Sequence, residues 1–260
     1  MKTALVTGAS SGIGETFARE LAQKKYNLVL VARSQDKLEQ LAIELSKKHQ
    51  INTEVISQDL TESNAGQKVF NLLQEKNIVV DLLINNAGFG DYGEFVSRPL
   101  SKQMAMIQLN ITALVELTGL FLPLMQERGN GAIVNVASIA GFQPIPYMSV
   151  YAATKAFVLS FSEALWAENK DKGVKVLVTC PGPTESEFYL NADFPDSAQS
   201  FEGMTLVSSE KVVEETLKAL EEKQSTVVTG GIANQIIVNL PRLFPRDLLV
   251  NLVGKQFKKI

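Results

Sequence analysis

The chain contains few of the side chains that bind metals or form disulfides. Its 260 residues include a single cysteine, Cys180, and a single histidine, His49. A disulfide within the chain is therefore excluded, and a zinc site of the usual cysteine and histidine type lacks ligands. We expect no bound metal, and a reducing compartment is compatible with this composition.

A surplus of basic charge is also missing. The chain carries 25 lysine and arginine residues against 28 aspartate and glutamate residues, which gives a formal net charge of −3. Nucleic-acid binding depends on a concentrated basic face, whereas here the basic residues are spread along the chain. This balance argues against nucleic acid as the main partner.

Long apolar runs are absent as well. No such run reaches the length of about 18 residues that a spanning helix needs, and the first predicted strand begins at Lys2. The sequence thus indicates neither a signal peptide nor a membrane-spanning helix, and we expect a cytoplasmic protein. Hydrophobic residues make up 45% of the chain and no linker-like stretch divides it, which predicts a single domain over residues 1–260.

What the sequence does contain is an alternation of β-rich and helix-like segments. Strands are expected at 3–8, 27–32, 52–57, 79–85, 132–138, 174–180 and 225–230. Helices are expected at 13–24, 35–48, 61–75, 100–126, around Tyr151 and at 210–221. Strands joined by helix-length crossovers pair in parallel and carry helices on both faces. The pattern predicts a doubly wound α/β (Rossmann) fold with about seven strands, which binds its ligands at the carboxyl ends of the strands.

A glycine-rich turn joins the first predicted strand to the first helix. Gly8, Gly12 and Gly14 follow the spacing G-x-x-x-G-x-G. Glycines there allow a tight turn and let backbone N–H groups approach a pyrophosphate at the helix N-terminus. A plain tight turn is the alternative. No Gly-Lys-Ser/Thr sequence follows, so hydrolysis of nucleoside triphosphates is disfavoured.

The second predicted strand ends in Ala32 and Arg33, without an acidic residue. NAD-specific sites place an acid there to bind the ribose 2′-hydroxyl, whereas a guanidinium can pair with a 2′-phosphate. This position favours NADP(H) over NAD, with a solvated Arg33 as the alternative. Lys37, one turn further on, is a second candidate for the phosphate.

Ser138, Tyr151 and Lys155 form an acid–base pattern. Tyr151 and Lys155 share one face of the predicted helix because positions i and i+4 lie one turn apart. A nearby ammonium favours the phenolate and lowers a tyrosine pKa from its ordinary value of about 10. General acid–base catalysis is most efficient when that pKa lies near the operating pH. The alternative is a half-buried tyrosine beside a solvated lysine.

Further motifs complete a recognisable set: NNAG at 85–88, Asn110 in LNIT and PGPTES at 181–186. With these motifs in this order, the sequence resembles the short-chain dehydrogenase/reductase family over roughly residues 3–230. The resemblance implies an oxidoreductase whose catalytic residues are Asn110, Ser138, Tyr151 and Lys155. Ser186 departs from the threonine that the family often has at this position, but a hydroxyl is kept.

The resemblance also implies a set of contacts with NADP(H). The pyrophosphate would be bound by Gly8, Ser10, Ser11, Gly12, Ile13 and Gly14, and the adenine by Asp59 and Leu60. The adenine ribose would be supported by Asn86, Ala87 and Gly88, and the nicotinamide end by Tyr151, Lys155, Pro181, Gly182 and Thr184.

In the reducing direction, the resemblance implies that NADPH gives a hydride to a carbonyl carbon while Tyr151 donates a proton to the oxygen. Ser138 would hydrogen-bond that oxygen, and Lys155 would lower the Tyr151 pKa and hold the nicotinamide ribose. The family pattern has Asn110 hold a water for proton relay, although by itself it reads as an ordinary polar helix residue.

Three loops after strands, at 89–97, 139–148 and 184–204, are rich in apolar and aromatic residues. Such a lining suits an apolar, aromatic or lipid-like carbonyl compound, although packing onto the core explains any one residue equally well. No basic cluster for a substrate phosphate or an acyl carrier is apparent. The expected reaction therefore interconverts a ketone and a secondary alcohol.

Two other functions stay open. A catalytically silent NADP(H)-binding regulator could use the same fold, but the four intact catalytic residue types argue against it. A nucleotide-sugar epimerase shares the Tyr-x-x-x-Lys pattern, but the glycine spacing and the lack of a sizeable domain after the sheet argue against it.

Residues 231–260 lie outside the strongest resemblance and mix apolar positions with Arg242, Arg246 and three lysines. We expect a C-terminal helical extension that closes the substrate cleft or forms a subunit interface, because Pro241 and Pro245 break the helical period into short pieces. A basic amphipathic segment on a membrane surface is the weaker alternative. The family resemblance implies a homodimer or homotetramer.

Overall fold

The protein is built around a single sheet of seven parallel strands. The computed structural model describes residues 1–195 and 206–258. The strands are β1 (Thr3–Thr7), β2 (Asn27–Ala32), β3 (Thr53–Ser57), β4 (Leu82–Asn85), β5 (Gly131–Val136), β6 (Val174–Cys180) and β7 (Thr226–Val228). Their order is β3-β2-β1-β4-β5-β6-β7, and every neighbouring pair is parallel. The predicted doubly wound fold is confirmed, and the strand order reverses between β1 and β4.

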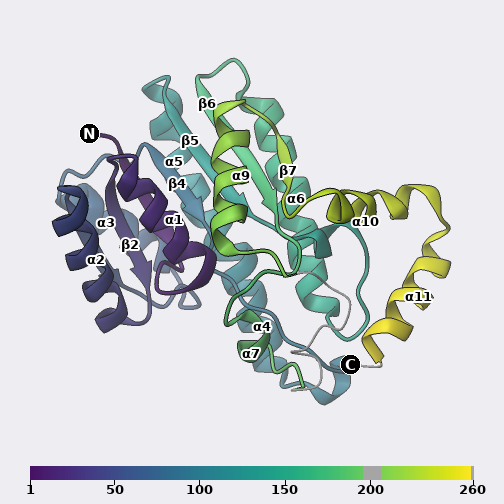
Figure 1. Ribbon diagram of the computed structural model, residues 1–260. Coiled ribbons are helices and arrows are strands. Elements are labelled where there is room, and N and C mark those ends of the chain that lie inside the picture. Colours follow the sequence, from purple (N-terminus) through teal and green to yellow (C-terminus); the bar gives the residue numbers. More distant parts are fainter. Residues whose placement is uncertain (196–205, 259–260) are drawn as a thin grey trace.

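Helices cover both faces of this sheet (Figure 1). One face carries α1 (Gly12–Gln23), α2 (Gln35–His49) and α9 (Ser209–Glu221), and the other carries α3 (Ala65–Glu75), α5 (Leu114–Glu127) and α6 (Ser149–Asn169). Leu28 and Leu30 of β2 pack toward the first face, while Val29 and Val31 pack toward the second. Since successive strand side chains point to opposite faces, a sheet covered on both sides needs the continuous apolar strands that the sequence has.

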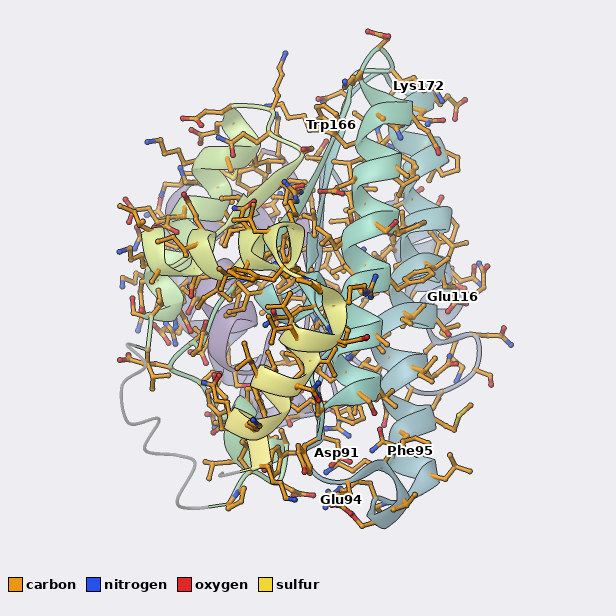
Figure 2. All side chains as sticks on the ribbon, turned by 90° about the vertical axis from the view of Figure 1, so that its right-hand side faces the viewer. Asp91, Glu94, Phe95, Glu116, Trp166 and Lys172 are labelled. Carbon is orange, nitrogen blue, oxygen red and sulfur yellow. The ribbon has the colours of Figure 1, made fainter. Side chains whose placement is uncertain are left out.

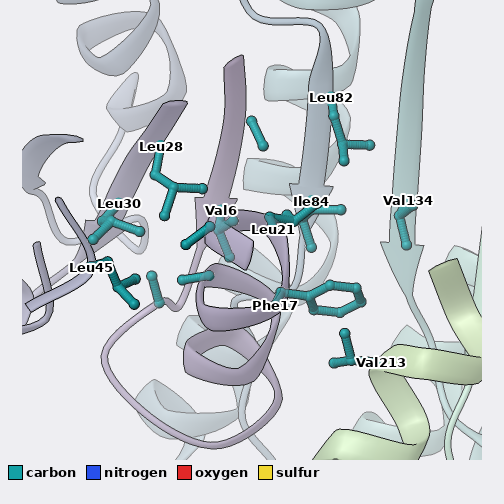
Figure 3. Packing of buried hydrophobic residues seen from close by; sticks show 14 of the residues in the cluster. Val6, Phe17, Leu21, Leu28, Leu30, Leu45, Leu82, Ile84, Val134 and Val213 are labelled. Carbon is teal, nitrogen blue, oxygen red and sulfur yellow. The ribbon is translucent and has the colours of Figure 1, made fainter. Parts of the chain in front are cut away.

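The core on the first face is centred on α1. Figure 3 shows Phe17 of α1 pointing toward Val213 of α9, beside Ile84 and Val134 of two central strands. Phe17 and Val213 are both fully buried. Burial of a phenylalanine side chain contributes about 1.5–3 kcal/mol, so this contact fixes α1 and the turn that precedes it against the sheet.

The segment expected to be one helix over 100–126 is interrupted. It forms α4 (Leu100–Ile107), a π-helical segment (Gln108–Ala113) and α5. Leu100–Glu127 is also the one segment, within the part of the chain that the structure describes, that is long and apolar enough to cross a membrane by length and composition. Its side chains Leu117, Phe121 and Met125 are at most 3% exposed in the core beside the sheet, which accounts for much of this apolar character.

Two helices follow the last strand, α10 (Ile232–Leu243) and α11 (Arg246–Lys258), and they lie at the β7 side of the molecule, far from α2 (Figure 1). Pro245 separates them, as the sequence predicts. The expectation that Pro241 also breaks the helix is wrong, because Pro241 lies inside α10. Because Pro241 lies near the end of α10, the backbone hydrogen bond that it cannot donate is lost only from the final turn. The division of the chain into one domain with an extension at 231–260 stays a prediction.

Candidate active site

The predicted site residues gather at the carboxyl ends of β1, β4, β5 and β6. Gly8 follows β1, Asn86 follows β4, Ser138 follows β5 and Pro181 follows β6. This edge includes the point between β1 and β4 where the strand order reverses. Doubly wound sheets open a crevice for ligands at such a point.

The glycine turn is fixed by close backbone packing. Gly8 and Gly12 have φ angles of +67° and +54°, which favour glycine. A Cβ at Gly14 would lie 2.1 Å from the carbonyl oxygen of Gly8, so no larger residue fits there without a backbone shift. Ser10, Ser11 and Ile13 are partly exposed around the start of α1. The N-terminal N–H groups of α1 therefore face a space that suits an anion.

Thr7, which sequence reasoning missed, ties this turn to the loop after β4. Its Oγ1 accepts hydrogen bonds from the N–H groups of Asn86 and Ala87, both at 3.0 Å. The Asn86 side chain donates in return to the carbonyl oxygen of Thr7 at 3.0 Å. The available signal was a threonine at the end of a buried strand, directly before the glycine turn. This exchange holds Asn86, Ala87 and Gly88 beside the glycine turn.

Arg33 stands open at the end of β2. Its side chain is 78% exposed, and its Nη1 lies 4.0 Å from Oδ2 of Asp59. The other carboxylate oxygen of Asp59 accepts hydrogen bonds from the N–H and hydroxyl of Thr61, at 2.9 and 2.8 Å. Burial raises the pKa of Asp59, but the Thr61 hydrogen bonds and Arg33 outweigh it, so the pKa is lowered overall. Leu60 is buried next to this pair, and Lys37 is exposed.

Ser138 and Tyr151 meet beside the end of β5. The Ser138 side chain caps a short 3₁₀ helix (Ile139–Phe142), accepting from the N–H of Ala140 at 3.1 Å and donating to the carbonyl oxygen of Pro181 at 3.3 Å. It also hydrogen-bonds Tyr151, which lies in the first turn of α6 and is 8% exposed. The hydroxyls that were predicted from the sequence are thus brought together.

The pKa of Tyr151 differs from the lowered value that the sequence led us to expect. Burial raises the pKa of Tyr151 to about 12, and the Ser138 hydrogen bond opposes this only in part. Burial lowers the pKa of Lys155 to about 8. Its Nζ lies 5.8 Å from the Tyr151 ring centre and donates to the carbonyl oxygen of Val136 at 2.8 Å. Loss of phenolate hydration therefore outweighs any lowering of the Tyr151 pKa by Lys155.

Asn110 lies in the π-helical segment and is 1% exposed. Its Oδ1 accepts from the N–H of Phe89 at 3.1 Å, and its Nδ2 donates to the carbonyl oxygen of Phe89 and to Thr154 Oγ1, both at 3.0 Å. Thr154 donates in turn to the carbonyl oxygen of Tyr151 at 2.7 Å. Asn110 thus joins the loop after β4 to the first turn of α6. Its expected role in holding a water stays a prediction.

The residues after β6 contact α10. A Cβ at Gly182 would lie 2.2 Å from the amide nitrogen of Asn234, a residue of α10 that sequence reasoning missed. Asn234 donates to the carbonyl oxygen of Thr229 at 2.8 Å, while Thr184 donates to that of Gly182 at 2.9 Å. Helix α10 therefore closes the site behind Pro181, Gly182 and Thr184.

An apolar cluster surrounds Tyr151. It combines Met106 of α4 and Met148 with residues around α7 (Phe188–Asn191) and two residues of α11, Val253 and Phe257. The ring of Phe188 lies 5.2 Å from that of Tyr151, and Tyr92 stacks on Phe194 at 4.7 Å. The apolar residues of the three loops thus pack on one another around Tyr151, and their contact with a substrate stays a prediction. Phe201 and Met204, which belong to the third loop, lie outside the described residues.

A charged cluster borders this apolar region. The carboxylate of Asp91, with a side chain that is 0% exposed, pairs with Arg98 and Lys102, and both bases also pair with Asp193 just after α7. Gln103 donates to Asp91 as well. This cluster could not be predicted from the sequence, because its members meet only when the loop after β4, α4 and the segment after α7 come together.

Metal binding has little support in the geometry. Over residues 1–195 and 206–258, no three histidine, cysteine, aspartate or glutamate side chains are grouped so as to hold a metal ion.

Comparison with known proteins identifies the family of this chain. A family model described as short chain dehydrogenase matches residues 2–193, from β1 to just beyond α7. The very-long-chain 3-oxoacyl-CoA reductase of Bos taurus is 40% identical over 185 residues, which cover 68% of this chain and 58% of that protein. The ketoacyl reductase HetN of a Nostoc species is 35% identical over 244 residues, covering 93% of this chain and 82% of that protein. The chain thus matches little more than half of the bovine relative.

Solved structures agree with these relatives. A short-chain dehydrogenase from Sphingobium yanoikuyae in complex with NADPH has a TM-score of 0.81 and 34% identity, covering 88% of this chain and 87% of that one. A bulky-bulky ketone specific alcohol dehydrogenase from Comamonas testosteroni has a TM-score of 0.78 and 31% identity, covering 94% of this chain and 92% of that one.

Proposed function

The chain belongs to the short-chain dehydrogenase family, and from this membership we propose that it is an NADP(H)-dependent oxidoreductase that interconverts a ketone and a secondary alcohol. The observation that carries the proposal is the meeting of Ser138, Tyr151 and Lys155 beside the glycine turn, at the carboxyl edge of the sheet.

The residues present fit a dinucleotide with a 2′-phosphate. The close packing of Gly8 and Gly14 keeps side chains away from the N-terminus of α1, where the pyrophosphate would bind, and the family resemblance assigns the adenine to Asp59 and Leu60. Arg33 is exposed and only loosely paired, so its guanidinium is available to a 2′-phosphate. The similar Sphingobium dehydrogenase is in complex with NADPH. When bound, the cofactor supplies or accepts the hydride.

Tyr151 is suited to donate a proton. A pKa of about 12 keeps its phenol protonated near neutral pH, which is the form that carbonyl reduction requires. Ser138 is placed to donate to the same carbonyl oxygen as negative charge develops there. With a pKa of about 8, Lys155 is mostly charged at neutral pH and stabilises the phenolate that remains after the proton leaves. These protonation states are the ones that the reducing direction requires.

We propose a substrate with a long apolar part, specifically a 3-oxoacyl thioester. The apolar cluster around Tyr151 suits an acyl chain, and the similar proteins are named for 3-oxoacyl-CoA, ketoacyl and bulky ketone substrates. A cofactor-binding regulator without catalysis would not need the Ser138 hydroxyl beside the buried Tyr151.

Oxidation of NADPH by 3-oxoacyl thioesters of increasing chain length tests this function. Tyr151→Phe removes the proton donor and little else, so kcat should fall by at least about 100-fold while NADPH binding is retained. Tyr26→Phe, at a tyrosine outside the site, is the matched control and should leave kcat unchanged. Wild-type kcat/KM for reduction should decline as the pH rises through about 8, where Lys155 loses its proton. A Tyr151→Phe variant with full turnover would overturn the proposal.

A homodimer or homotetramer is proposed as well, on the basis of the family resemblance, and the cytoplasmic location stays an expectation from the sequence. Sedimentation equilibrium of the purified chain measures the number of subunits, and a monomer at all concentrations would contradict it.

A further inference from the structure

A cleft outside the catalytic residues lies between α11 and the loops after β4 and β5. Its volume is about 450 Å³, and Phe95, Pro146, Tyr147 and Val250 supply much of its apolar wall. Figure 2 shows Glu94 and Phe95 at the lower end of the molecule, close to the end of α11. Gly254 allows the helix to approach this wall, since a Cβ there would lie 3.2 Å from Pro146. The cleft is large enough to hold part of a ligand.

The side of the cleft formed by α11 carries positive charge. Lys255 and Lys258 both line it and lie about one helical turn apart, so they share a face. Among the described side chains, neither lies within 4.0 Å of a carboxylate, whereas Lys102 pairs with two. Glu94 also lines the cleft, which leaves an excess of one positive charge. The helix dipole favours lysines in the last turn of α11, but it does not require them at the mouth of a cleft.

The cleft and the cluster around Tyr151 lie on neighbouring faces of α11. Val253 and Phe257, on the neighbouring face of α11, pack into that cluster. The Tyr92 hydroxyl donates to the carbonyl oxygen of Phe257 at 2.5 Å, and the Tyr92 ring lies 6.1 Å from the ring of Tyr147 in the cleft wall. Helix α11 therefore has one face toward the reaction centre and the next toward the cleft. A ligand that extended outward from Tyr151 past this helix would come to Lys255 and Lys258, which line the cleft on its far side.

We propose that this cleft is a subsite for the phosphate-bearing pantetheine end of an acyl thioester, with Lys255 and Lys258 pairing with phosphate. The inference rests on carbonyl reduction at Tyr151, and it names the other end of that substrate. An apolar interior next to an unpaired basic mouth matches an amphiphile whose acyl part is apolar and whose far end is anionic. The pantetheine chain would lie along Phe95, Pro146 and Tyr147.

The test compares thioesters of one 3-oxoacyl chain with different ends: pantetheine, 4′-phosphopantetheine and coenzyme A. In the double variant Lys255→Gln and Lys258→Gln, KM for the coenzyme A thioester should rise by about 10-fold or more, which corresponds to about 1.4 kcal/mol. The values of kcat and of KM for the uncharged pantetheine thioester should stay as in the wild type. The control is Lys172→Gln, an exposed lysine at the opposite end of the molecule in Figure 2, which should change none of them.

The source of the phosphate is separated by the third thioester. An equal rise in KM for the 4′-phosphopantetheine thioester places the lysines on the pantetheine phosphate, and a rise with coenzyme A alone places them on its adenosine phosphates. Calorimetric binding of coenzyme A itself gives a readout that does not need turnover, and the double variant should bind it more weakly.

Two results would overturn the subsite: equal effects on charged and uncharged thioesters, or no change in coenzyme A binding. Either can occur while the wild type still reduces the pantetheine thioester and Tyr151→Phe does not. In that case the reductase stands and only the subsite fails. Full turnover by Tyr151→Phe would instead remove the proposed function.

Discussion

The two halves of the candidate site are built by different means. On the cofactor side, the turn after β1 is shaped by backbone contacts, since Gly8 and Gly14 leave no room for side chains. On the proposed substrate side, the loops are held by side chains that come from distant segments, such as Asp91, Arg98 and Asp193. Backbone geometry is specified locally, whereas the side-chain assembly depends on the completed fold. The first half should therefore tolerate almost no substitution at its centre, and the second should respond in graded steps.

The largest effect is expected at the backbone contact. Gly14→Ala puts a Cβ into the carbonyl oxygen of Gly8, so α1 must shift. Overpacking of this kind costs about 1–3 kcal/mol or more, and NADPH affinity should fall by at least about 100-fold. Gly119→Ala, in α5, is the control, because nothing lies within 4 Å of its added Cβ. That change should leave binding intact and raise stability by up to about 1 kcal/mol. Similar losses at both positions would remove the contrast.

The next effect concerns the buried carboxylate on the substrate side. Asp91→Asn should destabilise the protein by about 2–4 kcal/mol in urea unfolding, because Arg98 and Lys102 lose their buried partner. Burial raises the pKa of Asp91, but these two cations lower it more, so the pKa lies below its ordinary value of 3.8. Its contribution is therefore complete above that pH and is lost as the pH falls below it. Wild type and variant should converge in stability at the acid end, and a constant difference would contradict the assignment.

A selective effect is expected at Arg33. Arg33→Ala should weaken NADPH binding by about 10-fold or more, since a charge-assisted pair contributes about 1.5–3 kcal/mol, and should leave NADH binding nearly unchanged. Fluorescence titration with both cofactors measures the ratio. Lys47→Ala, at an exposed lysine in the last turn of α2, is the matched control and should change neither affinity. Equal weakening of NADPH and NADH would refute the preference for NADP(H).

The smallest effect is expected where the charged cluster reaches the surface. Asp193 is 53% exposed in its pairs with Arg98 and Lys102. Exposed pairs contribute little, so Asp193→Asn should cost less than about 1 kcal/mol in unfolding. The KM of the Asp193→Asn variant for an apolar substrate should rise modestly, because the segment after α7 packs on the cluster around Tyr151. A loss of unfolding free energy as large as that of Asp91→Asn would show that the exposure of a charged side chain does not determine its contribution to stability in this half of the site.

The sequence predicted the parts of the molecule that are encoded locally. Gly8 and Gly14 mark a turn by their spacing, and Tyr151 and Lys155 share a helix face by theirs. Thr7 and Asn234 were missed because each is a single polar residue whose role depends on a distant partner: Asn86 and Ala87, 79 and 80 residues from Thr7, and Gly182, which lies after β6 and packs on Asn234. The pKa of Tyr151 was misjudged for a related reason. A neighbouring charge can be inferred from spacing, but the depth of burial that outweighs it cannot.

The two lysines at the cleft beside α11 could not be predicted from the sequence either. Lys255 and Lys258 look like ordinary solvated residues of a basic tail, and no substrate-binding basic cluster was apparent in the sequence. They gain a shared position only because Val253 and Phe257 seat the helix against the cluster around Tyr151. Packing of the apolar face decides where the charged face points.

The π-helical segment at Gln108–Ala113 changes the direction in which the side chains beyond it point. An α-helix advances by about 100° per residue, so one additional residue within a turn rotates everything beyond it by that amount. Upstream of the segment, Met106 faces the cluster around Tyr151; downstream, Leu117 and Phe121 face the sheet. A single continuous rod of chain thus serves two separate interiors. Deleting one residue between 108 and 113 would restore an even winding and bring the two halves of the rod into a phase that suits only one of those interiors.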